Sequence, residues 1–431
     1  MSDSTPSGGQ GAGVTDLRFE PREVVGVAML GAGGRARSLL RNLLATRGIR
    51  VVAVCDAVEE SARKAEAQIR EVSEEPVRIC GASDGEIREV LDRDDVDLVI
   101  VGTSWDGHTP LAVEAMEHGK HVGVEVPAAT TLDQCWSLVR TSERTRRHCM
   151  MLENCCYGDE ELLILNMVRD GAFGDLLHAE GSYIHDLRRM LLSDVGAGLW
   201  RRFPHTQRDG NLYPTHGLGP AANWLEINRG DRFERLVSMS SPHRGLEAWR
   251  AENVPADSPK QSETYVCGDM NTSLIKTARG LTITVQHDVV NPLPYSRGNV
   301  LIGTGGTFRD SPPRIYLERD AKGSGETGGE MGREEFGPLD RYRERYRHQL
   351  WRDEGSRARE VGGHGGMDFI MISRLIDCMH AGSAPDMDVY DAAALSAVGP
   401  LSEASVASGS APVEFPDFTG GRWRGGRINL S

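Results

Sequence analysis

Short apolar runs alternate with amphipathic segments along the first third of the chain. The run at 24–34 (VVGVAMLGAGG) ends in glycines and leads into RARSLLRNLLATRG, where apolar residues recur at helical spacing. Later apolar runs stand at 51–55, 97–103, 121–127 and 148–154. Strands that alternate with helices form a parallel, doubly wound sheet with helices on both faces. The pattern therefore predicts an α/β Rossmann domain at residues 22–155.

The pattern changes after residue 155. A helical segment at 160–168 comes first, and the strand-like runs that follow it are separated by short turns. These runs lie at 176–184, 234–241, 263–270, 272–278, 281–290 and 299–306. Consecutive strands joined by short turns indicate an open, largely antiparallel sheet. A polar loop at 321–335 and helices near 340–352, 366–380 and 390–408 complete the predicted α+β substrate-binding domain at 156–431.

The chain begins with MSDSTPSGGQGAG, which is rich in serine and glycine and offers little that a fold could bury. We expect residues 1–21 to form a disordered tail. They lack the apolar core of a signal peptide, and no stretch of the chain has the length of apolar sequence that crosses a bilayer. These features predict a cytoplasmic protein without a membrane partner.

Composition favours a globular enzyme. Hydrophobic residues make up 39% and charged residues 26% of the 431 residues, and the formal net charge is -14 at pH 7. A phosphate backbone or an anionic lipid surface would repel so acidic a protein. Nucleic acid is therefore not an expected partner.

The cysteines and histidines show no spacing that is typical of a metal site. The eight cysteines contain no C-x-x-C pair. His118 and His121 bracket Gly119, which is predicted to end a helix and would point the two rings in different directions. We predict reduced, mostly buried thiols and no metal.

One glycine-rich turn carries a specific signal. Residues 31–36 read G-A-G-G-R-A, which fits G-x-G-x-x-A, and they stand where a strand leads into a helix. Backbone N–H groups at such a turn bind a pyrophosphate with the help of the helix dipole. Asp56 ends the next strand, where its carboxylate would bind a ribose diol and repel the extra phosphate of NADP. The turn therefore predicts NAD as the cofactor.

From this motif onward the chain resembles the Gfo/Idh/MocA oxidoreductase superfamily, whose members carry an E-K-P motif at the end of a later strand. The corresponding residues here are Glu125, Val126 and Pro127. In the superfamily the lysine is assigned to proton handling at the carbon being oxidised, so the valine counts against an ordinary sugar dehydrogenase. An NAD-dependent sugar dehydrogenase and an inactive nucleotide-binding sensor stay open as alternatives.

Several longer stretches are similar to glycoside hydrolase family 109, the NAD-dependent N-acetylgalactosaminidases. They are Trp105-Asp106-Gly107-His108, VGVEVP, MLENCCYG, Y-P-T-H-G-L-G-P from Tyr213, NPLPYSRGN around Tyr295, and GGHGGMDFIM. The similarity covers almost the whole chain after the tail. Two features depart from the family: Gly34 replaces a frequent asparagine, and no twin-arginine export signal is present.

The glycine-rich turn and this resemblance together imply two sets of site residues. The set that would contact NAD is Gly31, Gly33, Gly34, Arg35, Asp56, Trp105, Asp106, Gly107, His108, Glu125, Val126, Asn154, Tyr213, Pro214, Thr215 and His216. The resemblance implies that Tyr183, Arg202, Tyr213 and Tyr295 face the sugar, and that Tyr183, Tyr213, His216 and Tyr295 act in catalysis. Trp105 and Tyr183 would also serve as packing aromatics, whereas the prolines and glycines around His216 suit an exposed site loop.

The activity that the resemblance implies is hydrolysis of a glycoside or glycan that bears an N-acetylhexosamine. Oxidation of the C3 hydroxyl by NAD makes the C2 hydrogen acidic, the aglycone leaves from C1, water adds, and the hydride returns to C3. Tyrosine and histidine can move the protons that this route requires, without the paired carboxylates of direct hydrolysis. The anomer, the C4 configuration, the aglycone and the residue that removes the C2 proton stay open. The oligomeric state is also open, although open sheets in this superfamily often pack against each other.

Overall fold

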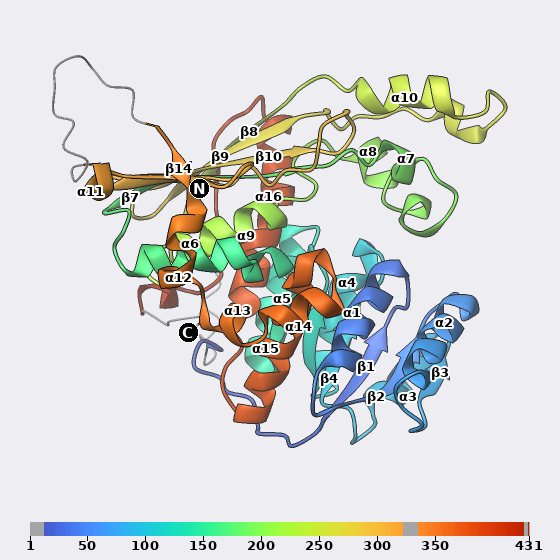
Figure 1. The fold of residues 1–431 in the computed structure, drawn as a ribbon. Helices are drawn as coiled ribbons and strands as arrows, with labels where there is room; N and C mark the ends of the chain where they lie inside the picture. The colour runs from blue at the N-terminus through green and yellow to red at the C-terminus, as the bar shows by residue number, and fades with distance from the viewer. Residues whose placement is uncertain (1–12, 322–334, 426–429, 431) are drawn as a thin grey trace, which may run out of the picture.

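The computed structural model describes residues 13–321, 335–425 and 430, which contain two sheets (Figure 1). The first sheet has six parallel strands in the order β3-β2-β1-β4-β5-β6. They are β1 (Val25–Leu30), β2 (Ile49–Cys55), β3 (Arg78–Cys80), β4 (Leu98–Val101), β5 (His121–Val124) and β6 (Cys149–Met151). The order reverses between β1 and β4, and ligands of such sheets bind in the crevice at that point. The predicted Rossmann sheet is confirmed.

Five helices connect these strands. They are α1 (Gly34–Ala45), α2 (Glu59–Arg70), α3 (Asp84–Leu91), α4 (Trp105–Glu117) and α5 (Leu132–Thr145). Each turns an apolar stripe toward the sheet; in α1 the buried side chains include Leu39, Leu40 and Leu43. The strands themselves are buried along their whole length in β1, β4 and β5, as expected for a parallel sheet covered on both faces.

The second sheet is mixed and has nine strands in the order β14-β13-β12-β11-β7-β10-β9-β8-β15. The strands are β7 (Leu176–Ile184), β8 (Phe233–Ser240), β9 (Asn271–Thr277), β10 (Thr282–Asp288), β11 (Val300–Gly303), β12 (Gly306–Arg309), β13 (Arg314–Leu317), β14 (Gly337–Pro338) and β15 (Val413–Glu414). All neighbours run antiparallel except β7 and β10. The predicted largely antiparallel sheet is confirmed.

Helices cover one face of this sheet, as Figure 1 shows for α6, α9 and α16. The helices of this half are α6 (Asp159–Arg169), α7 (Arg188–Leu191), α8 (Phe203–Gln207), α9 (Thr215–Trp224), α10 (Gly245–Asn253), α11 (Glu318–Ala321), α12 (Arg343–Tyr346), α13 (Gln349–Asp353), α14 (Gly355–Val361), α15 (Met367–Ala381) and α16 (Val389–Ala407). Helix α9 lies so close to β7 that a Cβ on Gly181 would stand 2.2 Å from the carbonyl oxygen of Gly217. Glycine at both positions therefore seats the start of α9 directly on the sheet.

Two secondary-structure predictions were wrong. The run at 263–270 is not a strand, because the amides of Val266 and Cys267 both donate to the carbonyl of His205 instead of to a neighbouring strand. The single helix predicted near 340–352 is divided into a 3-10 turn, α12 and α13. His348 is extended and its side chain accepts from the amide of Leu350, which starts a new helix.

Part of the predicted tail packs on the fold. Val14 and Phe19 are buried, and the Phe19 ring meets the rings of His121 and His148 at 4.7 and 4.6 Å between centroids. The amide of Phe19 donates to the carbonyl of Ser383, so contacts beyond the chain's first third fix this segment. The prediction of a disordered tail is therefore too long; residues 1–12, and the central residues of the loop predicted at 321–335, lie outside the described residues.

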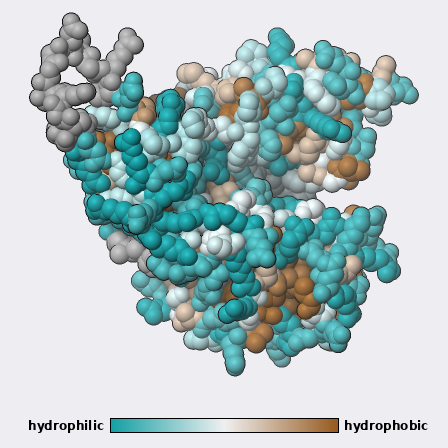
Figure 2. Space-filling model, viewed as in Figure 1, coloured by the Kyte–Doolittle hydropathy of each residue, from teal (hydrophilic) through white to brown (hydrophobic). Residues whose placement is uncertain are grey.

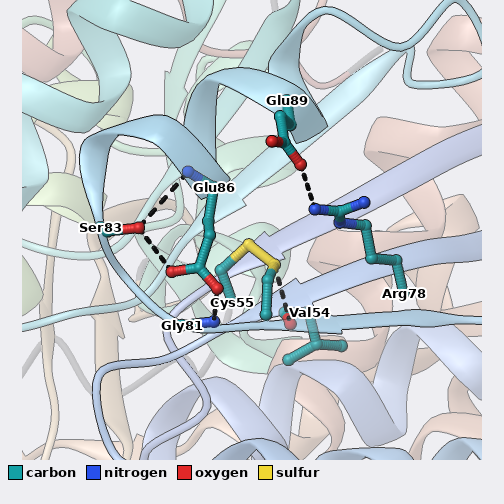
Figure 3. The surroundings of a disulfide bond; sticks show 8 residues. Val54, Cys55, Arg78, Gly81, Ser83, Glu86 and Glu89 are labelled. Carbon is teal, nitrogen blue, oxygen red and sulfur yellow. Dashed lines mark hydrogen bonds and ion pairs between the residues drawn. A yellow bond between two sulfur atoms is a disulfide. The ribbon is translucent and has the colours of Figure 1, made fainter.

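The prediction of reduced thiols was wrong for one pair. Cys55 and Cys80 form a disulfide with their Cα atoms 4.6 Å apart, while Cys135, Cys149, Cys155, Cys156, Cys267 and Cys378 are free and buried. The two bonded residues stand opposite each other at the ends of β2 and β3. Figure 3 shows the bond beside the turn that Ser83 and Glu86 close at the start of α3.

Among the described residues, no helix combines the length and apolar character that would let it cross a membrane. The boundary near residue 155 stays a prediction; the last strand of the first sheet ends at Met151, and the next helical turn begins at Asn154.

Candidate active site

The glycine-rich turn between β1 and α1 is open to a ligand. Gly31 has a φ of 100°, where glycine is favoured, and a Cβ there would lie 2.6 Å from the carbonyl oxygen of Gly102. Among the described residues, a Cβ on Gly33 or Gly34 would meet nothing within 4 Å, and no side chain caps α1. The first amides of α1 thus face open space, as a phosphate-binding helix end requires.

A cavity of about 470 Å³ extends from this turn along the edge of the first sheet. Its lining includes Gly33, Asp56 and Thr103 from the Rossmann half and Leu199 and Trp200 from the other half. In Figure 2 the surface is hollowed between the Rossmann helices and the part that carries α7 and α8. The cavity is therefore a cleft between the two halves, and its length leads from Asp56 past the glycine-rich turn.

Asp56 is fixed at the wall of this cleft. One carboxylate oxygen accepts from the amide of Ala32 at 2.6 Å, and the other accepts from the amide of Val58 at 2.7 Å. These bonds aim the carboxylate along the cleft and tie it to the glycine-rich turn. Each oxygen keeps a lone pair that a diol could use.

The predicted catalytic residues lie in one aromatic cluster. Tyr183 comes from β7, Tyr213 and His216 stand at the start of α9, and Tyr295 lies on the segment before β11. Ring centroids are 4.6 Å apart for Tyr183 and Tyr213, 5.4 Å for Tyr183 and His216, and 6.3 Å for Tyr183 and Tyr295. Trp105 stacks on Tyr213 at 5.8 Å. The structure thus brings all four residues together, and their roles stay predictions.

A hydrogen-bonded chain runs through this cluster from a carboxylate that the sequence analysis missed. Glu153 is fully buried, and its two oxygens lie 2.8 and 3.0 Å from Nδ1 of His216. The Nε2 of His216 lies 3.3 Å from the Tyr213 hydroxyl. Glu153 belongs to the MLENCCYG stretch, where an acid inside an otherwise apolar strand end was the available signal.

Charges along this chain are set by burial and by each neighbour. Burial would raise the pKa of Glu153, but His216 outweighs it and holds that pKa below its usual value. Burial also raises the pKa of the Tyr213 hydroxyl well above its usual value, although Arg201 opposes the shift. At neutral pH this hydrogen-bonded chain therefore consists of an ionised Glu153, His216 and a protonated Tyr213.

The adjacent arginines Arg201 and Arg202 lie in different surroundings, and the predicted sugar ligand Arg202 is the one that lies away from the cluster. The guanidinium of Arg202 is buried away from the cluster, bound to Glu263 at 2.8 and 3.0 Å and to two backbone carbonyls. Arg201 instead lies over three aromatic rings, at 4.8 Å from Tyr213, 5.3 Å from Trp105 and 5.9 Å from Tyr183. The partners of Arg202 thus lie within the protein, and Arg201 is the arginine that faces the cluster; the sugar-binding role predicted for Arg202 stays a prediction.

Arg35 joins the two halves of the protein. Its Nε donates to Glu125 at 2.8 Å, and its Nη atoms donate to Asp368 at 2.7 and 3.0 Å. Asp368 also accepts from the side chain of Asn154 at 2.8 Å. Burial opposes ionisation of Asp368, but the hydrogen bond from His364 and the charge of Arg35 keep its pKa below the usual range. Two residues predicted for the cofactor site, Arg35 and Asn154, are thus held by Asp368, which the sequence analysis did not single out.

The other residues predicted for the cofactor differ in position. His108 is buried, and its ring nitrogens lie 2.8 Å from the carbonyl of Pro127 and 3.2 Å from that of Thr103, so it fixes the loop that carries Val126. Burial lowers the pKa of His108, which favours the neutral ring. Asp106 is exposed in the first turn of α4, with Gly107 beside it, while Pro214 and Thr215 are buried at the start of α9.

Glu153, Cys155 and His216 offer three possible ligand atoms within 4.8 Å of one another. Each group already has a protein partner: Glu153 and His216 bind each other, and the Cys155 sulfur lies 3.6 Å from Nη1 of Arg297. Burial raises the pKa of Cys155 well above its usual value, which keeps the thiol protonated. The three groups therefore fit a hydrogen-bond network better than a metal site.

Comparison with protein families gives two matches that divide the chain. Residues 25–153 match the model described as "Oxidoreductase family, NAD-binding Rossmann fold". Residues 157–425 match the model described as "Glycosyl hydrolase 109, C-terminal domain".

Relatives match over nearly the full chain. A "Glycosyl hydrolase family 109 protein" from Solibacter usitatus is 52% identical over 420 residues, which cover 97% of this chain and 93% of the relative. An "Alpha-N-acetylgalactosaminidase" from Shewanella oneidensis is 44% identical over 98% of this chain and 91% of its own length.

Solved structures with a similar fold are dehydrogenases and other oxidoreductases. An NAD-binding oxidoreductase from Klebsiella pneumoniae has a TM-score of 0.69 at 15% identity and covers 92% of this chain and 100% of its own. Levoglucosan dehydrogenase in complex with NADH has a TM-score of 0.67 at 16% identity and covers 91% of this chain and 99% of its own. At this identity the likeness extends to the fold alone.

Proposed function

The chain belongs to glycosyl hydrolase family 109, and from this premise we propose that it hydrolyses N-acetylgalactosaminides with NAD as a cofactor restored in each turnover. It is a glycosidase by family. The sugar is proposed from the relative named alpha-N-acetylgalactosaminidase. The observation that carries the proposal is the Glu153–His216–Tyr213 hydrogen-bonded chain. Trp105 stacks on Tyr213 and meets Trp200, which lines the cleft at the glycine-rich turn.

The residues present fit NAD. The open amides at the start of α1 suit its pyrophosphate, and the Asp56 carboxylate suits the diol of its adenosine ribose. Trp105, Glu125 and Asn154 would flank the nicotinamide end; Arg35 holds Glu125 and Asp368 holds Asn154. Bound NAD supplies reversible hydride transfer at C3 of the sugar.

The protein's own groups would move the protons. Glu153 holds Nδ1 of His216, so Nε2 is the ring nitrogen available to the Tyr213 hydroxyl. A tyrosine that stays protonated at neutral pH can relay a proton: its oxygen would accept the proton of the C3 hydroxyl while its own proton passes to Nε2 of a neutral His216, and the reverse transfer would return the proton when C3 is reduced. Arg201, packed over the same rings, would bind sugar hydroxyls and stabilise negative charge that develops on them.

Burial would also serve this chemistry. Tyr183, Tyr213 and His216 are each less than one tenth exposed, which limits water around the reacting atoms. Tyr295 is 49% exposed and would cover the outer side of the sugar. We propose Tyr183, Tyr213, His216 and Tyr295 as the catalytic residues, and Arg201 with Tyr183, Tyr213 and Tyr295 as the sugar ligands.

A nitrophenyl α-N-acetylgalactosaminide tests the proposal directly. We expect nitrophenol release without accumulation of NADH, since the reduced cofactor returns its hydride within each turnover. NADH accumulation without nitrophenol release would instead identify a sugar dehydrogenase. Release that persists after complete removal of NAD would contradict the proposed mechanism.

A further inference from the structure

A second cavity, of about 520 Å³, lies beside the catalytic cluster. Its walls come from α6, α12, α13, α14 and the turn before α15, which lie close together in Figure 1. The charged lining includes Arg297, Arg343, Arg347, Arg359 and His364, with Asp159, Glu160 and Glu161 on α6. Its lining is thus dominated by groups that bind polar ligands.

One carboxylate in this cavity is shared by three guanidiniums. Asp159 accepts from Arg347 at 2.7 and 3.0 Å and from Arg359 at 3.0 Å, and it lies 3.5 Å from Arg343. A single carboxylate cannot neutralise three guanidiniums. Glu161 pairs with Arg297, and Arg343 pairs with Glu160 and with the exposed Asp340. Arg347 and Arg359 therefore share Asp159, in a chain whose net charge is -14.

The exposure of the arginine side chains falls from the rim of the cavity to its inner end. The Arg359 side chain is 51% exposed and Arg347 is 29% exposed, whereas Arg297 is 14% exposed at the inner end. Within the described residues, Nε of Arg297 is buried without a hydrogen-bond partner. An oxyanion that entered the cavity would meet the exposed guanidiniums of Arg359 and Arg347 first.

The cavity shares its inner wall with the catalytic site. Arg297 contacts the sulfur of Cys155, two residues after Glu153, and stands two residues after Tyr295. At the rim, His364 lies 2.9 Å from Asp368, which binds Asn154. The cavity therefore adjoins the segments that carry Glu153 and Tyr295.

We propose that this cavity is an aglycone subsite for an oxyanion, a carboxylate or a sulfate ester, on the residue beyond the bond that is cleaved. The inference rests on the proposed glycosidase function and adds a substrate class to it. The N-acetylated sugar itself is neutral, so the arginines are not required to bind it. Planar guanidiniums suit carboxylate and sulfate because they donate two parallel hydrogen bonds.

The test uses aryl N-acetylgalactosaminides that differ only in one aglycone substituent: a carboxylate, its uncharged carboxamide, a sulfate ester and an aminomethyl group. We expect kcat/KM for the carboxylate or the sulfate to exceed that for the carboxamide by on the order of tenfold at low salt, equivalent to about 1.4 kcal/mol. The aminomethyl compound should be the poorest substrate. The carboxylate and sulfate arms identify which oxyanion the subsite prefers.

Arginine variants locate the effect. Arg347→Ala and Arg359→Ala should each lower the ratio of carboxylate to carboxamide turnover severalfold. The matched control is Arg345→Ala, because Arg345 is 68% exposed and pairs with Asp170 outside the cavity. Its ratio should equal that of the unaltered protein.

The outcomes separate this inference from the function on which it rests. Equal kcat/KM for carboxylate, sulfate and carboxamide would overturn the subsite while leaving the glycosidase intact. An equal loss of preference in Arg345→Ala would overturn it too, since the effect would come from overall charge. Failure to cleave any of the four compounds would count against the proposed function itself.

Discussion

The Nδ1 atom of His216 lies 2.8 Å from a carboxylate oxygen of Glu153, which is fully buried. The two residues come from separate segments, one from the end of the first sheet and one from α9 on the second. A buried carboxylate at Nδ1 fixes the orientation and tautomer of the ring and stabilises its protonated form. Glu153 is therefore a positioning residue for His216, and the contact links the cofactor half to the sugar half.

Glu153→Gln should lower kcat on nitrophenyl N-acetylgalactosaminide by on the order of 10²-fold, because the amide cannot stabilise a protonated His216. The pH profile of kcat should also change, which a purely structural role would not cause. Glu180→Gln is a suitable control, since Glu180 lies on β7 of the second sheet with 39% of its side chain exposed. An unchanged kcat and pH profile in Glu153→Gln would contradict the assignment.

Replacing the two adjacent arginines should give opposite results. Arg201→Ala should reduce kcat/KM by about ten- to a hundredfold, the usual range for a lost charged hydrogen bond, and leave the melting temperature nearly unchanged. Arg202→Ala should remove the ion-pair partner of Glu263 and cost about 3 kcal/mol of unfolding free energy. Kinetics and denaturant unfolding on both variants check this; loss of turnover per folded molecule in Arg202→Ala alone would restore the sequence-based assignment.

The sequence predicts both domains, but it does not predict which of these two arginines faces the cleft. The strand and helix periods predicted both domains, because burial on one or both faces imposes those periods on the chain. Which of Arg201 and Arg202 faces the cleft depends on a single step of the backbone near α8, and no local pattern encodes it. The Cys55–Cys80 pair similarly depends on the register of β2 against β3, which becomes known only once the sheet is assembled.

Glu153 and Asp368 were not predicted as site residues for a different reason. Glu153 and Asp368 stand within stretches that the sequence analysis did quote, but a carboxylate in an apolar stretch has no partner until the fold supplies one. Their partners, His216 and Arg35, are 63 and 333 residues distant. A buried acid in a predicted strand end is the signal that could have found Glu153, since such a group must be paired.

Asp56→Asn should shift the cofactor preference toward NADP. The change removes the negative charge that repels a 2′-phosphate but keeps one oxygen that can accept from the amide of Ala32 or Val58. The ratio of NADP to NAD affinity should rise by about tenfold, measured by titration of cofactor-free protein. An unchanged ratio would place the adenosine ribose elsewhere in the cleft.

Stability should fall in acid as the buried carboxylates take up protons. Asp368 and Glu153 have folded-state pKa values below the usual ones, so the stability that their ionised forms contribute is present above about pH 4 and is lost as the pH falls below it. The melting temperature should decline on going from about pH 6 to about pH 3, and Asp368→Asn should flatten this decline. Asp353→Asn, an exposed change on α13, should not. If the melting temperature of Asp368→Asn declined with pH in parallel with that of the unaltered protein, the pKa of Asp368 would not be depressed in the folded state.

Tyr213→Phe tests the proposed chemistry at the reacting atoms. The substitution keeps the ring that packs on Trp105 and Tyr183 and removes only the hydroxyl 3.3 Å from Nε2 of His216. We expect kcat to fall by on the order of 10²- to 10⁴-fold, the scale of general acid–base groups, with fold and bound NAD retained. Tyr157→Phe is the matched control, because Tyr157 is equally buried but its hydroxyl donates to Asp386, outside the cluster.

Turnover in deuterated water adds the decisive readout: elimination after C3 oxidation requires removal of the C2 proton, so the product should carry deuterium at C2. Product that keeps its full C2 proton signal would exclude the elimination route, whereas C2 exchange that continues in Tyr213→Phe without aglycone release would place Tyr213 after the proton-removal step.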